Sequence, residues 1–261
     1  MKRLLVVLDF DGLLVNAYDL IRTTFAGFDL DVGDETRFRN RRKFLKYLGG
    51  GKELLGNLAN FALPKKRRLR EELTRVYLAR GRVHEPFVGY VNACIRAPQV
   101  HVGVVSRNFT LNPGATIRHV LAVSGIDDGD LDFVVPLPVG AKKFNVLDGM
   151  VSSRYRARLL AGDEIGDYKA AVATGYTPLI ASYGFDGAER LRVHGDVPPA
   201  ALFDTPAELA ARLWTLSALY LDEPMPAGLG DRTTPQATPL TLVAGTVRPA
   251  HSSAQMPAPI S

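Results

Sequence analysis

Two short clusters of carboxylates are the residues of this sequence whose spacing could support chemistry. The first contains Asp9 and Asp11, two residues apart and followed by Gly12. One carboxylate of such a pair can attack an electrophile while the other moves a proton. In phosphoryl transfer, a carboxylate nucleophile divides one difficult displacement into two easier steps through an aspartyl-phosphate. An acidic loop that only caps a strand has the same composition, so this interpretation needs support from other residues of the sequence.

The second cluster is GDEIGD, residues 162–167, which contains Asp163 and Asp167. Hard carboxylate oxygens suit Mg²⁺, which takes one or two carboxylates directly and keeps water or phosphate oxygens as its other ligands. A cation is also needed for the proposed chemistry, because a carboxylate and an anionic phosphate repel each other. Taken alone, these aspartates could instead cap the N-terminus of a helix.

Two features between the clusters could bind a phosphate group. Ser106, Arg107 and Asn108 follow an apolar run, and the serine hydroxyl and neighbouring backbone N–H groups could hold phosphate oxygens. Lys142 and Lys143 precede a helical pattern, and either ammonium could neutralise the nucleophile and the phosphoryl group. Most serines and lysines have no such role, so each feature is weak evidence by itself.

The apolar pattern predicts the elements that position these residues. Short apolar runs predict strands near 3–9, 100–105, 133–135, 158–161, 178–181 and 202–203, and helical patterns alternate with them from residue 112 to 219. This succession predicts an α/β fold with a mostly parallel sheet and helices on both faces. Each polar cluster follows a predicted strand, where ligands bind in such sheets.

The order of the four features carries a resemblance. A strand with DxDG, a strand with Ser106, a lysine before a helix, and a strand with GDxxxD resemble the four motifs of haloacid dehalogenase-like hydrolases, in particular phosphoglycolate phosphatase-like members. The resemblance covers residues 4–14 and 100–209, including AAVATGYTPLIASYGFDG and LFDTPAEL. It implies a Rossmann-like core with an inserted α-helical cap domain.

The resemblance also implies roles. Asp9 would be the nucleophile, and Asp11 the acid that protonates the leaving group and then activates water. Ser106, Arg107, Asn108 and Lys143 would bind the substrate phosphate, with Ser106 and Lys143 also counted as catalytic. Mg²⁺ would be held by Asp9, the backbone carbonyl of Asp11, Asp163 and Asp167.

Three positions qualify the resemblance. Leu13 stands where many relatives have threonine, and Glu164 replaces a smaller residue of the fourth motif. Spacing only mildly favours Lys143 over Lys142 as the active-site lysine. True dehalogenases lack the second aspartate, so Asp11 disfavours dehalogenation.

The predicted organisation is a core at 1–14 and 99–221, a helical cap at 15–98 and a disordered tail at 222–261 rich in Pro, Thr and Ala. The cap carries 17 Lys or Arg against nine Asp or Glu, although the whole chain has a net charge of only +5. Basic residues at 37–46, or Lys52 after three glycines, could grip a distal anionic group of a substrate. GGGKE lacks the spacing of a nucleotide-binding P-loop.

The predicted function is therefore a magnesium-dependent phosphatase acting on a small phosphate monoester, such as a sugar phosphate, a phosphoglycolate-like acid or a nucleotide. Two alternatives stay open, namely a phosphomutase with the same two aspartates and a non-catalytic nucleic-acid-binding or regulatory protein, the latter suggested by the basic cap. The single cysteine and the lack of a long apolar segment lead us to expect a cytoplasmic protein with no membrane partner.

Overall fold

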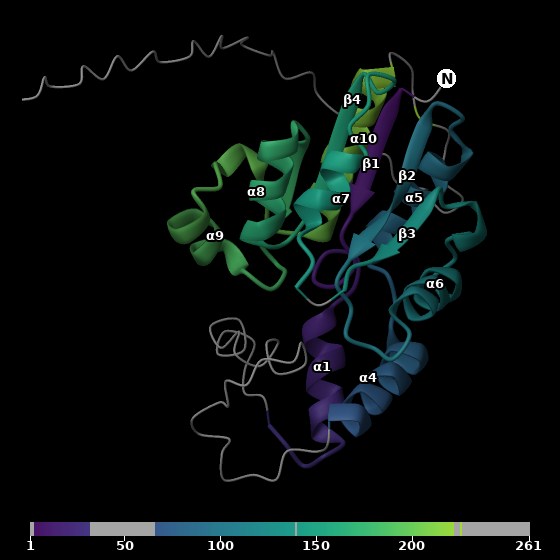
Figure 1. Ribbon diagram of the computed structural model, residues 1–261, viewed down its shortest axis with the longest axis vertical. Helices are drawn as coiled ribbons and strands as arrows, with labels where there is room; N and C mark the ends of the chain where they lie inside the picture. The colour runs from purple at the N-terminus through teal and green to yellow at the C-terminus, as the bar shows by residue number, and fades with distance from the viewer. Residues whose placement is uncertain (1–2, 32–65, 139, 222–224, 226–261) are drawn as a thin grey trace, which may run out of the picture. The chain divides into compact units, whose positions relative to one another are not determined.

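The computed structural model describes residues 3–31, 66–138, 140–221 and 225, apart from the side chains of Lys66 and Asp128 (Figure 1). The chain divides into two units, residues 1–231 and 232–261, and every described residue belongs to the first. The basic residues at 37–46, the glycines before Lys52, and all of the predicted tail except Met225 lie outside the described residues.

A six-stranded parallel sheet forms the centre of the first unit. Its strands are β1 (Leu4–Leu8), β2 (Val100–Ser106), β3 (Phe133–Pro136), β4 (Ala157–Gly162), β5 (Thr177–Ala181) and β6 (Leu202–Phe203). They lie in the order β3-β2-β1-β4-β5-β6, and every neighbouring pair is parallel. Each strand predicted from the apolar runs is present, so the predicted α/β, Rossmann-like sheet is confirmed.

After β2 the helices follow the predicted alternation, with one further helix between β5 and β6 that the apolar pattern did not indicate. They are α1 (Ala17–Ala26), α4 (Lys66–Arg80), α5 (Glu85–Arg96), α6 (Pro113–Val123), α7 (Lys143–Gly149), α8 (Ile165–Thr174), α9 (Gly187–Gly195) and α10 (Pro206–Leu221), with short 3₁₀ turns at Asp128–Asp130 and Pro199–Ala201. None of the helices in the described part of the chain combines the length and apolar character that a bilayer crossing requires.

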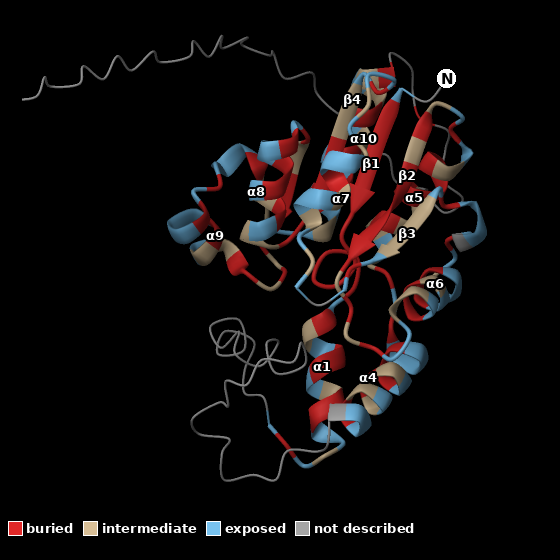
Figure 2. Ribbon diagram, in the orientation of Figure 1, coloured by how far each residue is buried: buried red, intermediate tan, exposed pale blue. Residues whose placement is uncertain are grey.

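Strand β1 is buried on both faces, as Figure 2 shows by its red colour. Successive side chains of a strand point to opposite faces. Leu4, Val6 and Leu8 accordingly join the large apolar cluster that includes residues of α5, α6 and α10, whereas Leu5 and Val7 join a second cluster with residues of α7 and α8. Helices therefore cover both faces of the sheet. The strand LLVVL has no polar residue because neither of its faces is exposed to water.

The strand register brings the predicted motifs to one edge of the sheet. Leu8, the last residue of β1, lies opposite Val104 of β2 and Ala161 of β4. The residues that follow in each strand, including Asp9, Ser106 and Asp163, therefore emerge at the same carboxyl edge. This edge is where an open parallel sheet binds ligands.

Helices α1, α4 and α5 lie between the first two strands in the described part of the chain, and α1 and α4 contact each other. The two connections to the core run side by side, because Val15 pairs with Val83 in an antiparallel bridge and the His84 N–H donates to the Leu14 carbonyl at 2.8 Å. Helix α5 falls within the predicted cap range of 15–98, yet it packs against β2 and α10. We propose that α5 belongs with the core and that the insert ends before it.

Candidate active site

Lys143 lies at the centre of the polar cluster at the carboxyl edge. Its Nζ is 2.6 Å from Oδ2 of Asp9 and 2.6 Å from Oδ1 of Asp167, and all three side chains are almost fully buried. Lys142 is exposed and stands just before the first residue of α7. The lysine that reaches Asp9, the candidate nucleophile, is therefore Lys143.

Asp167 is held by the start of α8. Its Oδ2 accepts the backbone N–H groups of Asp163 and Glu164, each at 3.1 Å, which fixes the loop that precedes the helix. A Cβ atom on Gly162 would lie 2.4 Å from the same oxygen, so only glycine allows this contact. Asp167 therefore both caps the helix and binds Lys143.

Asp163 is fully buried, and only one of its two carboxylate oxygens accepts a hydrogen bond from a described residue. Its Oδ2 accepts the Phe185 N–H at 2.6 Å, whereas its buried Oδ1 has no hydrogen-bond partner among the described residues. Gly12 and Gly184 press against this carboxylate, because a Cβ on either would lie within 2.4 Å of an Asp163 atom. An unpaired buried carboxylate oxygen is costly, and this one is available to a further partner.

A divalent cation fits this arrangement. One carboxylate oxygen each from Asp9, Asp163 and Asp167 lies within 4.8 Å of the others. Burial raises the pKa of Asp9, with Lys143 opposing the shift, and burial together with the charge of Asp9 raises the pKa of Asp163 well above its usual value. The cluster holds three buried carboxyl groups and one ammonium, which pairs with Asp9 and Asp167. Its acidic groups therefore outnumber its cation, and its all-oxygen donors are those that Mg²⁺ prefers.

Asp11 lies on the same loop and is held by two donors. The Tyr77 hydroxyl donates to its Oδ1 at 2.8 Å, and Nδ2 of Asn108 donates to its Oδ1 and Oδ2 at 3.3 and 3.0 Å. Burial raises the pKa of Asp11 to about 7, against the opposing effect of the Tyr77 hydrogen bond. An acid of this strength exchanges a proton readily near neutral pH.

The predicted phosphate-binding segment lies beside Asp9. Ser106 is fully buried, and its hydroxyl makes no hydrogen bond with any described residue. The hydroxyl lies near Asp9 and lowers the pKa of that carboxyl group. Arg107 donates from Nη2 to the Ala141 carbonyl at 2.8 Å, in the loop before Lys143. The Asn108 side chain is engaged with Asp11, so it contacts the candidate acid and base.

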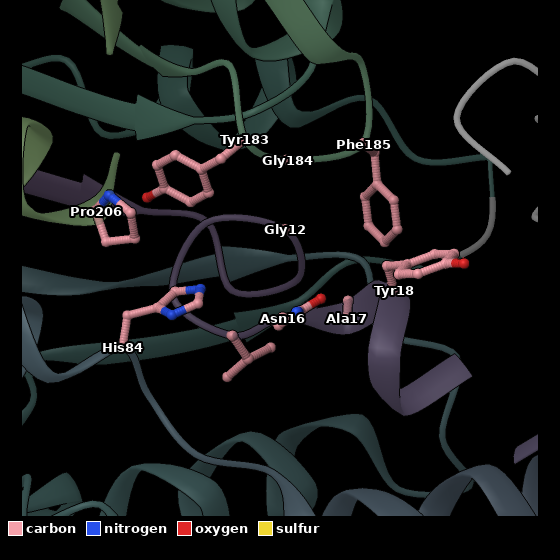
Figure 3. A pocket seen from close by; sticks show the side chains of 10 residues that line it. Gly12, Asn16, Ala17, Tyr18, His84, Tyr183, Gly184, Phe185 and Pro206 are labelled. Carbon is pink, nitrogen blue, oxygen red and sulfur yellow. The ribbon is translucent and has the colours of Figure 1, made fainter. Parts of the chain in front are cut away.

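A separate cavity of about 270 Å³ lies beside the loop that carries Gly12 (Figure 3). It is lined by residues 12 and 15–18, His84, residues 183–185 and Pro206, and by none of the carboxylates named above. Figure 3 shows Tyr183 and His84 on one side of the Gly12 loop and Tyr18 and Phe185 on the other. Since Gly12 packs on Asp163, the cavity lies next to the polar cluster but outside it.

Sequence reasoning missed Tyr77 as a site residue. Its position fits the apolar helical spacing of Leu69, Leu73 and Val76, which predicts a core side chain, and its ring is in fact buried. Only the polar tip of a tyrosine among those apolar residues hinted at a buried partner, because a buried phenol usually makes a hydrogen bond.

Comparisons with known proteins identify the fold. The sequence matches no protein-family model and no curated protein. A predicted phosphatase from Clostridium acetobutylicum matches 82% of this chain and 99% of its own, with a TM-score of 0.53 and 15% identity. A haloacid dehalogenase-like family hydrolase from Streptococcus pneumoniae matches 80% of this chain and 97% of its own, with a TM-score of 0.51 and 16% identity.

A third similar structure is that of protein tyrosine kinase A from Mycobacterium tuberculosis, which has a TM-score of 0.53 and 16% identity over 81% of this chain and 98% of its own. These neighbours carry different activities, so the fold by itself selects no reaction. The parallel sheet, its strand order and the structural neighbours agree with the resemblance of the motifs, and the chain has the haloacid dehalogenase-like fold.

Proposed function

We propose that the protein is a magnesium-dependent phosphatase that hydrolyses a small phosphate monoester through an aspartyl-phosphate on Asp9. The observation that carries this proposal is the joining of Asp9 and Asp167 by one buried ammonium, with Asp163 beside them and the held carboxyl of Asp11 on the same loop. This set supplies a nucleophile, a cation site and a proton donor within one polar cluster.

Asp9 is suited to attack. Its Oδ1 accepts the N–H of Phe10 at 2.7 Å and its Oδ2 accepts from Lys143, so the carboxylate is held in one orientation. Lys143 favours the charged form of Asp9 and would also offset the charge of a phosphoryl group that arrives beside it. In the first step an Asp9 oxygen bonds to phosphorus, and the bond from phosphorus to the ester oxygen breaks.

Asp11 would move the proton in both steps. It gives its proton to the departing ester oxygen, and it then takes a proton from the water that attacks phosphorus and releases Asp9. Its pKa of about 7 allows both forms at neutral pH. Ser106 and the backbone N–H groups that follow it would bind phosphate oxygens, with Arg107 on the same segment.

Asp9, Asp163 and Asp167 would hold Mg²⁺, and the Asp11 backbone carbonyl is proposed as a further ligand. When bound, Mg²⁺ supplies positive charge that offsets the repulsion between the carboxylates and an anionic phosphate. The unpaired Oδ1 of Asp163 supports this assignment, because no described protein group occupies that oxygen.

The test is a panel of phosphate monoesters that includes sugar phosphates, phosphoglycolate and nucleoside monophosphates. Phosphate release is measured with Mg²⁺ and with excess chelator. The proposal expects release that requires Mg²⁺ and differs among the esters. Transfer of the phosphoryl group between two positions of a sugar phosphate, without free phosphate, would identify a mutase. Binding of nucleic acid with no turnover of any ester would contradict the proposal.

A further inference from the structure

The candidate acid, Asp11, is held by a side chain that the sequence motifs do not include. Tyr77 belongs to α4, 66 positions along the chain from Asp11, and its hydroxyl donates to Oδ1 at 2.8 Å. Tyr77 is 1% exposed, so no water competes for this hydroxyl. A buried hydrogen bond to a carboxylate is stronger than one between neutral groups, and it fixes both partners.

Asn108 holds the other side of the same carboxyl group. Its Oδ1 accepts the backbone N–H of Thr110 at 3.0 Å, and a backbone nitrogen can only donate. The amide nitrogen of Asn108 must therefore face Asp11. Oδ1 of Asp11 receives two donors and Oδ2 receives one, so Oδ2 keeps the freer lone pair on which a transferable proton can reside.

The helix that carries Tyr77 and the segment that carries Asn108 are bound to each other. Arg70 of α4 donates to the carbonyls of Phe109 and Thr110 at 3.0 and 2.6 Å. The Leu111 N–H donates to the Thr74 hydroxyl at 2.9 Å. Positions 70, 74 and 77 lie on one face of a helix, so a single face of α4 sets the place of Tyr77 relative to Asp11.

We propose that Tyr77 is a positioning residue for general acid–base catalysis, which holds the Asp11 carboxyl group so that Oδ2 exchanges the proton with the leaving group and then with water. This inference rests on the proposed function and adds to it a residue from the insert. In the first step an Asp9 oxygen bonds to phosphorus as the bond from phosphorus to the ester oxygen breaks, the electron pair of the broken bond stays on the ester oxygen, and the proton of Asp11 passes to that oxygen. In the second step the water oxygen bonds to phosphorus as the bond from phosphorus to Asp9 breaks, and one proton of the water passes to Asp11.

The test uses the dependence of kcat/KM on the leaving group. A poor leaving group such as an alkoxide needs the proton, whereas nitrophenolate leaves without it. Tyr77→Phe keeps the ring and removes only the donor. We expect its kcat/KM to fall by about ten-fold or more for alkyl phosphates and by less than about three-fold for nitrophenyl phosphate. We use kcat/KM because this constant covers only the steps up to and including the departure of the leaving group.

Tyr90→Phe is the matched control. Tyr90 is equally buried, and its hydroxyl shares a hydrogen bond of 2.9 Å with Ser217 between α5 and α10, with no contact to Asp11. Both variants lose one buried hydroxyl and should lower the thermal midpoint, Tyr77→Phe by more because its hydroxyl bonds a carboxyl group. Only Tyr77→Phe should change the leaving-group dependence.

Asp11→Asn serves as the reference variant. Its kcat/KM should fall more for alkyl phosphates than for nitrophenyl phosphate, as in Tyr77→Phe but by a larger factor. A loss in Tyr77→Phe that is equal for alkyl and nitrophenyl esters, while the wild type turns over both, would overturn the role of Tyr77 and leave the proposed function intact. Absence of magnesium-dependent turnover by the folded wild type would overturn the proposed function, and the role of Tyr77 with it.

Discussion

The ammonium of Lys143 lies 2.6 Å from Oδ2 of Asp9, a residue 134 positions away in the sequence. The same ammonium is 2.6 Å from Oδ1 of Asp167, so one cation on the first residue of α7 joins the residue after β1 to the first turn of α8. Desolvation alone would lower the pKa of this lysine, but its two carboxylate partners raise it above its usual value. The lysine is therefore charged throughout the physiological pH range.

Replacement of Lys143 should damage both activity and stability. Lys143→Met leaves two buried carboxylates without their cation, and breaking a buried pair in this way costs about 3 kcal/mol in the free energy of unfolding. Turnover should fall by about 10²-fold or more, as when one group that stabilises the developing charge is removed. Lys142→Met changes an exposed side chain and should leave both properties unaltered. Ester turnover and urea denaturation of the two variants measure this, and equal effects would contradict it.

Magnesium should stabilise the folded protein through Asp163. At a concentration 100 times its Kd, a bound ion adds about 2.7 kcal/mol to the free energy of unfolding. Asp163→Asn keeps an oxygen for the Phe185 N–H but removes one negative charge from the cluster. The variant should lose the stabilisation by Mg²⁺, yet in chelator it should be no less stable than the wild type, because like charges are relieved. Thermal unfolding with Mg²⁺ and with chelator tests this, and equal stabilisation of both proteins by Mg²⁺ would exclude Asp163 as a ligand.

Gly184 should not tolerate a larger residue, because its backbone packs directly against the side chain of Asp163. A Cβ at this position would lie 2.3 Å from the Cβ of Asp163, so Gly184→Ala must displace that carboxylate or the loop that carries Phe185. We expect weaker Mg²⁺ dependence of turnover and a loss of about 1–3 kcal/mol in stability. Gly166→Ala is the matched control, since no atom lies within 4 Å of its added Cβ. Activity that falls equally in both variants would show that the space around Asp163 is not the cause.

Cys94 should be unreactive while the protein is folded. The residue is fully buried, and burial raises the pKa of its thiol from 9.0 to about 12. Thiolate is the reactive form, so a disulfide-exchange reagent at pH 8 should modify Cys94 only after unfolding. Because the folded pKa lies above the unfolded one, the contribution of this thiol to stability is present below pH 9 and is lost as the pH rises toward about 12. Rapid modification of the native protein would contradict the buried placement.

The site could be predicted from the sequence where strand ends determine it. Asp9, Ser106 and Asp163 each follow a run of apolar residues, and parallel strands bring such positions to one edge. This reasoning favoured Lys143 over Lys142 only mildly, because the two lysines are adjacent at the start of the same helix. The choice depends on side-chain direction at the first residue of α7, which apolar periodicity does not encode.

The contacts of Tyr77 and Asn108 with Asp11 could not be predicted from the sequence pattern. Tyr77 fits the apolar spacing of its helix, and its spacing carries no information on which group its hydroxyl meets. The place of Asn108 after Ser106 predicts phosphate binding, which stays a prediction, but it gives no sign of the contact of its amide with Asp11, which depends on Thr110 holding the other end of the side chain. Both contacts depend on how α4 packs against residues 109–111, a long-range relationship that local pattern does not determine.

The most direct test of the proposed mechanism is to trap the phosphorylated enzyme. The protein is quenched in acid during turnover of its best ester with Mg²⁺, reduced with borohydride, and digested for peptide mass spectrometry. Borohydride converts an aspartyl-phosphate to homoserine, and we predict homoserine at position 9, with none in Asp9→Asn, which should fold but release no phosphate. Turnover without a modified residue 9, or activity that survives in Asp9→Asn, would contradict the assignment of Asp9 as the nucleophile.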